Sequence, residues 1–336
     1  MNIQQWLALT VEDALEPDLP IVDSHHHIWP DSPADPYPAY TMDALFQDKA
    51  ASGHNIIATV YVDSHASHRT SGPEELKVVG ETDYAERVAQ EGNRRGGRFA
   101  GVCAAIVPPA NLCLGARVGA VLDAHMAASP RMRGIRHMTA FAAEIPPVYG
   151  AGEAGIMLRP DFRAGFAELA PRKLNFDAWL FQHQLPEFVD LARAFPGTSI
   201  VLEHLGGPQG IGRYVGRREE AFAEWKRNMM DAAHCDNVVL KLGTLNMSYT
   251  GVHGVGEPRP RTSEEMARAQ RDYILTAIDI FGPDRCMFES NFPVDMLGTS
   301  YNVLWNCFKR VTTGFTPAER TNLFSAVAIR TYRLAL

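Results

Sequence analysis

Short apolar runs alternate with longer amphipathic stretches along most of the chain. Eight runs have the length and composition of strands, at residues 19–25, 55–64, 98–107, 132–138, 174–181, 198–205, 237–243 and 285–290. Several of them are apolar on both faces, as strands buried in a parallel sheet are. The pattern therefore predicts a parallel sheet covered by other elements.

Four stretches between these runs carry apolar residues at helical spacing, at 115–128, 185–195, 219–233 and 268–281. Two of them end in "AFPG" and "FGPD", which are normal helix stops. Eight strands that alternate with helices predict an α/β fold, a (β/α)8 TIM barrel. Because no Gly-, Pro- or Ser-rich linker divides the chain, we expect one domain over residues 1–336.

Three segments are too long for simple connections: 64–80, 139–161 and 244–265. Each follows a predicted strand, so in a TIM barrel each lies on the C-terminal face, where active sites form. Long irregular loops at that face are candidates for lids over a substrate.

Composition narrows the class of protein. Apolar residues make up 46% of the 336 residues, which is enough for a large core, and the net charge of −7 comes without a basic block. This balance argues against nucleic acid or an anionic membrane as a partner. The first 20 residues lack the pattern of a signal peptide, and the five cysteines are scattered without a CxxC pair. We therefore expect a reduced, cytoplasmic protein.

Polar residues collect at the ends of most of the predicted strands. In a barrel these positions supply the reacting groups, so we expect the side chains to converge. They are Asp23, His25, His26, His27, Asp63, His65, Arg136, His137, Gln182, His183, Gln184, Glu203, His204, Lys241, Glu289, Asn291 and Asp295.

The run "SHHH" contains two histidines with the same orientation. Residues two apart on a strand face the same way, so His25 and His27 project together and His26 projects oppositely. Two imidazoles at this spacing can bind one divalent metal or one anionic group. The alternative is a pair of hydrogen-bonded polar residues in a turn. The presence of His204 at the same predicted rim favours the functional interpretation.

Three motifs resemble those of the amidohydrolase superfamily. "VDSHHH" is similar to its D-x-H-x-H start, "IVLEHLGGP" (200–208) to the H-x-G-x-P element of its amidohydrolase-related branch, and "RCMFESNFPVD" (285–295) to the strand-eight element G-[ST]-D-[WY]-P. They occur in the expected order, each at the end of the corresponding strand, and the similarity covers residues 19–336. The branch contains lactonases and metal-dependent decarboxylases of cyclic or aromatic acids.

The resemblance implies roles for individual residues. His25 and His27 become ligands of a divalent metal such as zinc, and His204 becomes a further ligand or an acid/base group. The strand-eight aspartate of the family falls on Asn291, which cannot act as a general base and can bind a metal only through a neutral oxygen. Asp295 is then the first candidate for the base. A metal-free site is the alternative, in which these groups bind substrate and stabilise an oxyanion.

Other polar residues are candidates for substrate binding. Arg136 can hold a carboxylate or sulfonate in two parallel hydrogen bonds, or form an internal salt bridge to Glu203 or Glu289. Lys241 can bind an anion or stabilise an oxyanion, or pair with the same two glutamates, since a lone buried charge is expensive. Glu203 itself is expected to face away from His204.

The loop after the second strand offers His65 to an incoming anion, or is simply a solvated loop. The strand-five histidine that the resemblance implies falls on Gln182 or His183.

These observations predict a hydrolase that opens a lactone on a small carboxylated or sulfonated ring, so its partner is a small anionic cyclic substrate. Three alternatives stay open: a metal-dependent non-oxidative decarboxylase, a cyclic amide hydrolase, and a catalytically inactive barrel that binds a small molecule. Assembly into a homo-oligomer also stays open.

Overall fold

The computed structural model describes residues 2–31, 39–145 and 152–336, and all eight predicted runs contain a strand. The strands are β1 (Ile21–His26), β2 (Ile56–Val62), β3 (Ala105–Val107), β4 (Gly134–Arg136), β5 (Asn175–Ala178), β6 (Ile200–Leu202), β7 (Val238–Leu242) and β8 (Cys286–Phe288). The largest shortfall is at β3. Positive φ angles at Gly101 and Cys103 turn the backbone out of the extended conformation, so most of the predicted run 98–107 is not strand.

A helix follows each strand. These helices are α2 (Met42–Ala51), α3 (Val79–Arg95), α4 (Val118–Ala128), α5 (Pro160–Phe166), α6 (Leu185–Ala194), α7 (Arg218–Ala233), α8 (Ser263–Phe281) and α9 (Tyr301–Val311). A short helix α1 (Ile3–Leu7) precedes them, and α10 (Pro317–Thr321) and α11 (Val327–Thr331) follow. The four predicted helices are confirmed as α4, α6, α7 and α8. The sequence analysis did not identify α2, α3, α5 and α9.

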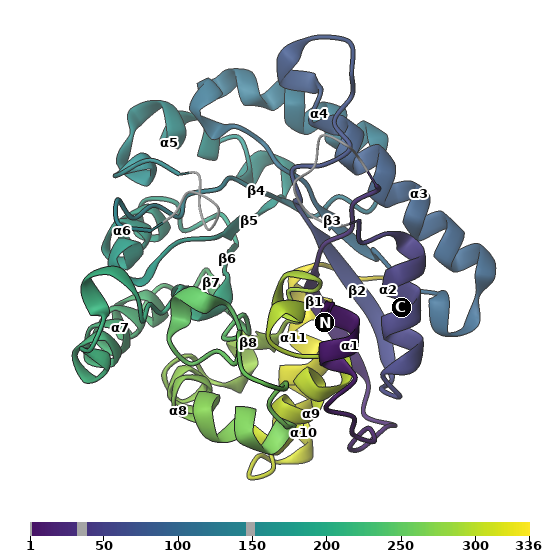
Figure 1. Ribbon diagram of the computed structural model, residues 1–336. Coiled ribbons are helices and arrows are strands. Elements are labelled where there is room, and N and C mark those ends of the chain that lie inside the picture. The colour runs from purple at the N-terminus through teal and green to yellow at the C-terminus, as the bar shows by residue number, and fades with distance from the viewer. Residues whose placement is uncertain (1, 32–38, 146–151) are drawn as a thin grey trace.

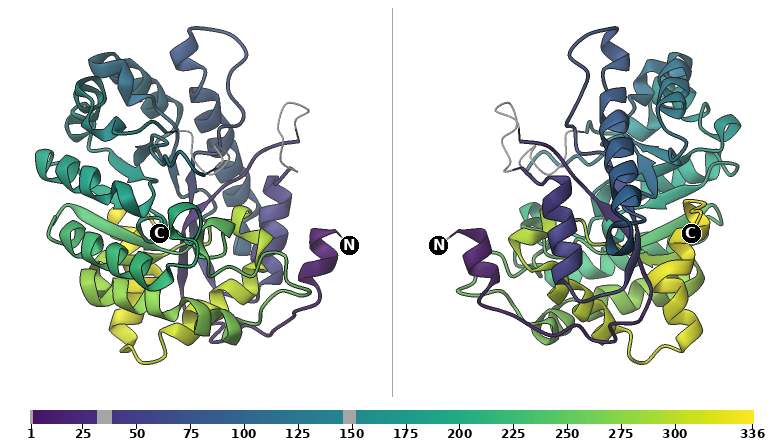
Figure 2. Two further views of the ribbon diagram at one scale, coloured as in Figure 1. Left: turned by 60° about the vertical axis from the view of Figure 1, so that its left-hand side comes forward. Right: turned by 90° about the vertical axis from the view of Figure 1, so that its right-hand side faces the viewer.

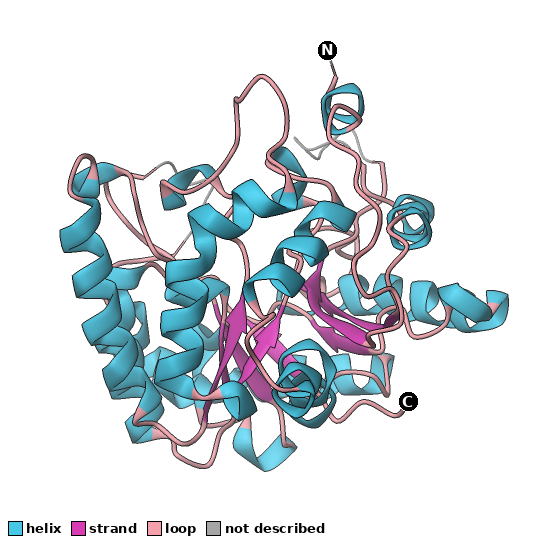
Figure 3. Ribbon diagram, turned by 90° about the horizontal axis from the view of Figure 1, so that it is seen from below, coloured by secondary structure: helices cyan, strands magenta, loops and turns pink. Residues whose placement is uncertain are grey.

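The strands form two parallel sheets, of order β1-β2-β3 and β4-β5-β6-β7-β8. Isolated parallel bridges link them at two seams, between Ile106 and Met132 and between His26 and Phe292. At the second seam the backbone N–H of His27 donates to the carbonyl of Phe292 at 2.7 Å. The arrangement is the predicted (β/α)8 barrel, with strands at the centre and helices around them (Figures 1 and 3).

Apolar side chains fill both sides of the strand layer. One large cluster packs between strands and helices, and a second lies within the barrel, where Val22, Val60, Val201 and Met287 meet Tyr332 from beyond α11. The loop between β2 and α3 projects past the helices at the top of both views in Figure 2. Within the described ranges, no helix is both long and apolar enough to cross a membrane.

Candidate active site

Three imidazoles meet at the C-terminal ends of β1 and β6. His25 Nε2 lies 3.1 Å from His27 Nε2, and the ring centroids of His25 and His204 are 4.7 Å apart. All three side chains are buried. His26 points the other way, as predicted, because its Nε2 lies 2.8 Å from Thr59 Oγ1. The prediction that His25 and His27 project together and His26 projects oppositely is therefore confirmed.

The Nδ1 atom of each imidazole in this cluster faces an acceptor outside it. His27 Nδ1 lies 2.9 Å from the carbonyl oxygen of Val62, and His204 Nδ1 lies 2.8 Å from Glu289 Oε1. His25 Nδ1 lies 3.0 Å from Glu203 Oε1 and 3.1 Å from Glu289 Oε2. These oxygens only accept, and Thr244 Oγ1, 2.6 Å from His204 Nδ1, can accept as well, so the protons of His27 and His204 are assigned to Nδ1. Lys241 Nζ also lies near His25 Nδ1, but it donates to Asp177 and Glu203, so the His25 proton is assigned to Nδ1 between the two glutamates. Each Nε2 lone pair is thereby left available to the site.

Asn291 brings a further lone pair to the histidine pair. Its Nδ2 donates to Asp295 Oδ1 at 2.9 Å, which turns its Oδ1 toward His27 Nε2 at 3.2 Å. The amide orientation is supported from behind, since Asn246 Nδ2 donates to Asp295 Oδ2 at 3.0 Å and Gln270 Nε2 donates to Asn246 Oδ1 at 2.9 Å. Two acceptors this close repel each other unless a proton or a cation lies between them.

The spacing of these atoms fits a metal ion. Two nitrogens on one tetrahedral zinc, at about 2.05 Å each, are separated by about 3.3 Å. The separations of His27 Nε2 from His25 Nε2 and from Asn291 Oδ1 are 3.1 and 3.2 Å. Ligand atoms of His25, His204 and Glu289 also lie within 4.8 Å of one another. The donor chemistry and the spacing therefore both suit a divalent cation.

Burial keeps the histidine pair neutral. It lowers the pKa of His27 to about 4, helped by the positive charge of Arg136. It also lowers the pKa of His25 well below its usual range, helped by Lys241. Metal binding requires the unprotonated imidazole, so these two rings are in the competent form near neutral pH.

The barrel interior carries an excess of negative charge. Lys241 Nζ pairs with Asp177 at 2.8 Å and with Glu203 at 3.2 Å, and it also lies 3.2 Å from His25 Nδ1. Burial works against ionisation of Glu203 and Glu289, yet the cations and imidazoles beside them outweigh it and lower the pKa of both carboxyls. With Asp63, whose pKa is also lowered, at least three carboxylates face the two cations of this interior, Lys241 and Arg136. A divalent cation would offset that excess.

Arg136 is committed to internal salt bridges. Its Nε lies 3.3 Å from Asp63 Oδ2, its Nη1 lies 3.4 Å from Glu203 Oε2, and its Nη2 donates to the carbonyl of Asp63. These contacts match the alternative in which the arginine pairs inside the protein. They leave no pair of N–H groups on Arg136 free to bind a substrate carboxylate. Lys241 likewise has Glu203, one of its two expected partners.

The expectation that Glu203 faces away from His204 is wrong. Glu203 Oε1 lies against His25, and its Oε2 is 3.9 Å from His204 Nε2. Glu203 keeps an extended backbone and lies two residues after Val201, whose side chain is inside the barrel, so it faces inward by regular alternation. His204 has a φ of 57°, and this left-handed backbone turns its side chain to the same side.

Left-handed backbone recurs at the ends of the strands around the site. His65, His204, Thr244 and Asn291 have φ angles of 57°, 57°, 63° and 54°. Such conformations are strained for residues other than glycine and concentrate at functional sites. The strain therefore marks the same region as the imidazole cluster.

The residues predicted at strand five lie outside the cluster. Gln182 is buried, and its Nε2 donates to the carbonyl of Ala221 while its Oε1 accepts from the N–H of Gln209. His183 Nδ1 lies 3.0 Å from Gln209 Oε1. Gln182 and His183 therefore both connect the loop after β5 to the loop after β6 through contacts with Gln209. The aromatic neighbour of His204 from this strand end is Trp179, at 4.8 Å between ring centroids, which sequence reasoning missed.

His65 lies at the edge of the site, with a side chain 53% exposed and its Nδ1 3.1 Å from Asp63 Oδ1. Asp295 folds back beneath the site, as a turn after Pro293 allows, and its N–H donates to the carbonyl of Asn291. Burial raises the pKa of Asp295 to about 7. Both of its oxygens accept from amides, so in this arrangement it orients Asn291, and its role as a base stays a prediction.

Asp23, the first residue of the D-x-H-x-H motif, joins β1 to the end of β8. Its Oδ2 accepts from Ser290 Oγ at 2.6 Å and from Tyr301 Oη at 2.9 Å. Burial raises its pKa to about 6. This carboxyl therefore holds the two strands that carry the histidine pair and Asn291 in register.

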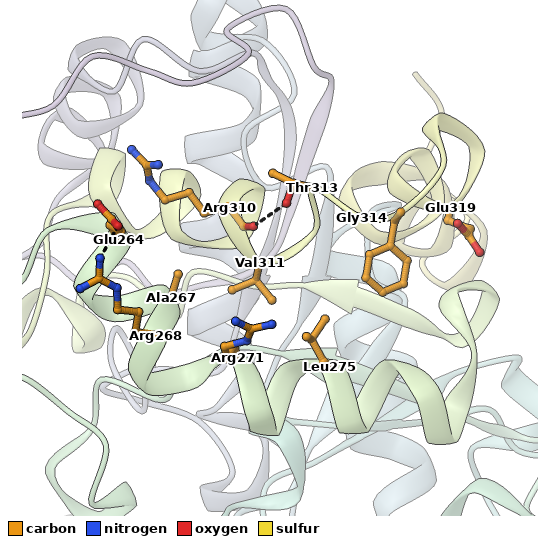
Figure 4. Close-up of a pocket in the computed structure, with 11 residues that line it drawn as sticks. Glu264, Ala267, Arg268, Arg271, Leu275, Arg310, Val311, Thr313, Gly314 and Glu319 are labelled. Carbon is orange, nitrogen blue, oxygen red and sulfur yellow. Dashed lines mark hydrogen bonds and ion pairs between the residues drawn. The ribbon is translucent and has the colours of Figure 1, made fainter.

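A groove of about 780 Å³ lies elsewhere, on the helix layer between α8 and the end of α9 (Figure 4). Arg268, Arg271 and Arg310 line it together with apolar residues that include Val311 and Phe315. It shares no lining residue with the imidazole cluster, and Arg268 is paired with Glu264.

Comparisons with known proteins agree with the motifs. Residues 22–334 match the model of the amidohydrolase family. The chain is 32% identical to y4mH, an uncharacterised protein of Sinorhizobium fredii, over 94% of this chain and 99% of that one. It is 26% identical to an L-fucono-1,5-lactonase of Burkholderia ambifaria, over 93% and 95%. A crystal structure of an amidohydrolase from Burkholderia multivorans with bound zinc superimposes with a TM-score of 0.69 at 24% identity, covering 94% of this chain and 99% of that chain.

Proposed function

We propose that this chain, which belongs to the amidohydrolase family, opens a lactone ring by hydrolysis with the help of a divalent metal. Membership of the family and similarity to an L-fucono-1,5-lactonase support a hydrolase. The lactone substrate and the metal are what we propose. One observation carries it. The Nε2 lone pairs of His25 and His27 and the amide oxygen of Asn291 converge at about the spacing of ligands on one ion.

In this proposal, His25, His27 and Asn291 hold the metal, which is zinc in the crystal structure of the Burkholderia multivorans amidohydrolase. The bound ion supplies Lewis-acid polarisation of the ring carbonyl and lowers the pKa of water toward about 7. The carbonyl of Val62 accepts from His27 Nδ1, and the carboxylates of Glu203 and Glu289 both face His25 Nδ1, so these groups keep both Nε2 lone pairs directed at the ion. Such outer partners set ring orientation at metal sites generally.

His204 is the residue best arranged to move the proton. Its Nδ1–H is held by Glu289, so its Nε2 can take a proton from the attacking water as the water oxygen bonds to the ring carbonyl carbon. The ester C–O bond then breaks, and His204 returns the proton to the leaving alkoxide, which gives a hydroxy acid. The carboxylate of Glu289 stabilises the imidazolium formed between these steps. Asp295 is the alternative base.

The charges of the interior favour an uncharged ring over the carboxylated or sulfonated ring expected from the sequence. Arg136 and Lys241 already have carboxylate partners. Neither side chain is therefore free to pair with an incoming carboxylate, and burying a charge without a partner is costly. The L-fucono-1,5-lactonase relative is consistent with a sugar lactone as the first class of substrate to test.

The test is metal analysis of the purified chain together with a panel of neutral and carboxylated lactones, followed with a pH-sensitive dye. We expect about one metal per chain, proton release with neutral lactones, and loss of both in the His27→Ala variant. His26→Asn is the matched control, because His26 faces away from the cluster. Release of carbon dioxide from an aromatic acid without proton release from any lactone would identify a decarboxylase and refute the proposal.

A further inference from the structure

We propose that Glu289 is a positioning residue that sets the tautomers of two imidazoles at once, those of His25 and His204. The inference rests on the proposed function, because the metal and the proton-transfer step use the Nε2 lone pairs that this assignment directs into the site. One carboxylate would thereby determine both metal binding and acid/base chemistry.

The two oxygens of Glu289 face different rings. Its Oε1 lies 2.8 Å from His204 Nδ1, and it also accepts from the backbone N–H of His204 at 3.1 Å and from Thr244 Oγ1 at 3.3 Å. Its Oε2 lies 3.1 Å from His25 Nδ1. This contact is an ion-pair distance without hydrogen-bond geometry, because Oε2 has no hydrogen-bond partner among the described residues. Oε2 is therefore an acceptor that is still available to a proton on His25 Nδ1. Three donors therefore fix the orientation of the carboxylate, and the remaining oxygen is directed at His25.

The fold makes room for this side chain. Glu289 directly follows β8, and the neighbouring strand β7 is followed by Gly243. A Cβ atom at position 243 would lie 2.4 Å from Glu289 Cγ and 2.7 Å from the carbonyl oxygen of Glu289. Any larger residue there would displace the side chain and the backbone of Glu289, so the position of Glu289 requires the glycine after β7.

The contacts distinguish a positioning role from direct metal ligation. Oε1 is already the acceptor for three donors, and both oxygens face Nδ1 atoms, on the sides of the rings away from the Nε2 lone pairs. Glu203 also faces His25 Nδ1, but its Oε1 is shared with Lys241 at 3.2 Å. Glu289 is therefore the acceptor common to both imidazoles.

Two substitutions separate the two contacts. In Glu289→Gln the amide oxygen should take the place of Oε1, where three donors require an acceptor, and the NH2 group should then face His25. We expect His204 to keep its Nδ1–H form and His25 to shift toward Nε2–H. Glu289→Met removes both acceptors at similar volume, so both rings should change. The readout is the ring nitrogen NMR spectrum of the full chain, stripped of metal and labelled with 15N-histidine.

Zinc affinity, measured by competition with a chromophoric chelator, should fall about 10–100-fold in both variants, the range typical of lost outer partners at metal sites. Gly243→Ala should act in the same direction, because the added Cβ displaces the side chain and backbone of Glu289 and leaves the chemistry of its carboxylate unchanged. Glu86→Gln is the matched control. Glu86 is a buried acid of α3 that accepts from Ser129 and Arg131, so its loss should lower thermal stability and leave tautomers and zinc affinity unchanged.

Unchanged tautomers in both Glu289 variants would overturn the proposal. If zinc affinity nevertheless fell, Glu289 would be a direct ligand. The tautomers are measured without metal or substrate, so shifted rings in a protein that hydrolyses no lactone would refute the proposed function and leave the role of Glu289 standing.

Discussion

Replacing Asn291 by aspartate tests whether this position is arranged around a neutral amide. In the structure the Nδ2 of Asn291 donates to Asp295 Oδ1 at 2.9 Å. The Asn291→Asp substitution puts two carboxyl oxygens at about that separation, away from solvent. Two unit charges 2.9 Å apart repel by about 6 kcal/mol at an effective dielectric constant of about 20, which corresponds to about four pKa units. The pair should therefore keep one proton that the unfolded chain has lost.

The sign of the pH dependence follows from the direction of the pKa shift. Burial already raises the pKa of Asp295 to about 7, above its ordinary value of 3.8. A raised carboxyl pKa contributes stability that is lost as pH rises from about 4 through the folded-state value. For the natural protein this loss ends near pH 7. For Asn291→Asp it should continue beyond pH 7 at about 1.4 kcal/mol per pH unit, or about 3 kcal/mol between pH 7 and 9.

The assay is denaturant unfolding of the metal-free chain at several pH values, with the double variant Asn291→Asp/Asp295→Asn as control. The double variant has one carboxyl and one amide at the pair, as the natural protein has, so the additional slope should disappear. Zinc should restore part of the stability of Asn291→Asp, because an anionic ligand replaces a neutral oxygen beside His27. Equal slopes between pH 7 and 9 for the natural protein and Asn291→Asp would refute the reasoning.

Five further substitutions test the rest of the site. His25→Ala or His27→Ala should abolish metal binding and turnover, whereas His26→Asn should mainly lower thermal stability; equal losses of activity at all three positions would count against the strand geometry. Arg136→Lys should lower the melting temperature and leave KM for neutral lactones almost unchanged, because the guanidinium contacts protein acceptors. A sharply raised KM would instead indicate that Arg136 binds the substrate. Lys241→Met should lower the free energy of unfolding by about 3–5 kcal/mol in denaturant titrations, because it leaves buried carboxylates unpaired; a loss below about 1 kcal/mol would contradict the charge balance described above.

Local patterns in the sequence were sufficient for the fold class and for the centre of the site. Strand runs and their spacing predicted the barrel, because apolar periodicity reports which residues must be buried. Alternation along one strand identified His25 and His27 as a pair and excluded His26, and the structure agrees. These successes share a cause: each depends on the geometry of one continuous segment.

Only the tertiary structure decided which donor meets which acceptor. Glu203 and His204 face the same side because the backbone becomes left-handed at His204, and no pattern of side chains in the sequence predicts that turn. Arg136 meets Asp63 from a strand that is not adjacent in sequence. The tautomers likewise depend on Glu289, which reaches His25 and His204 from β8. Such contacts depend on the register between strands and on the path of their loops, and these properties are set by packing across the whole barrel.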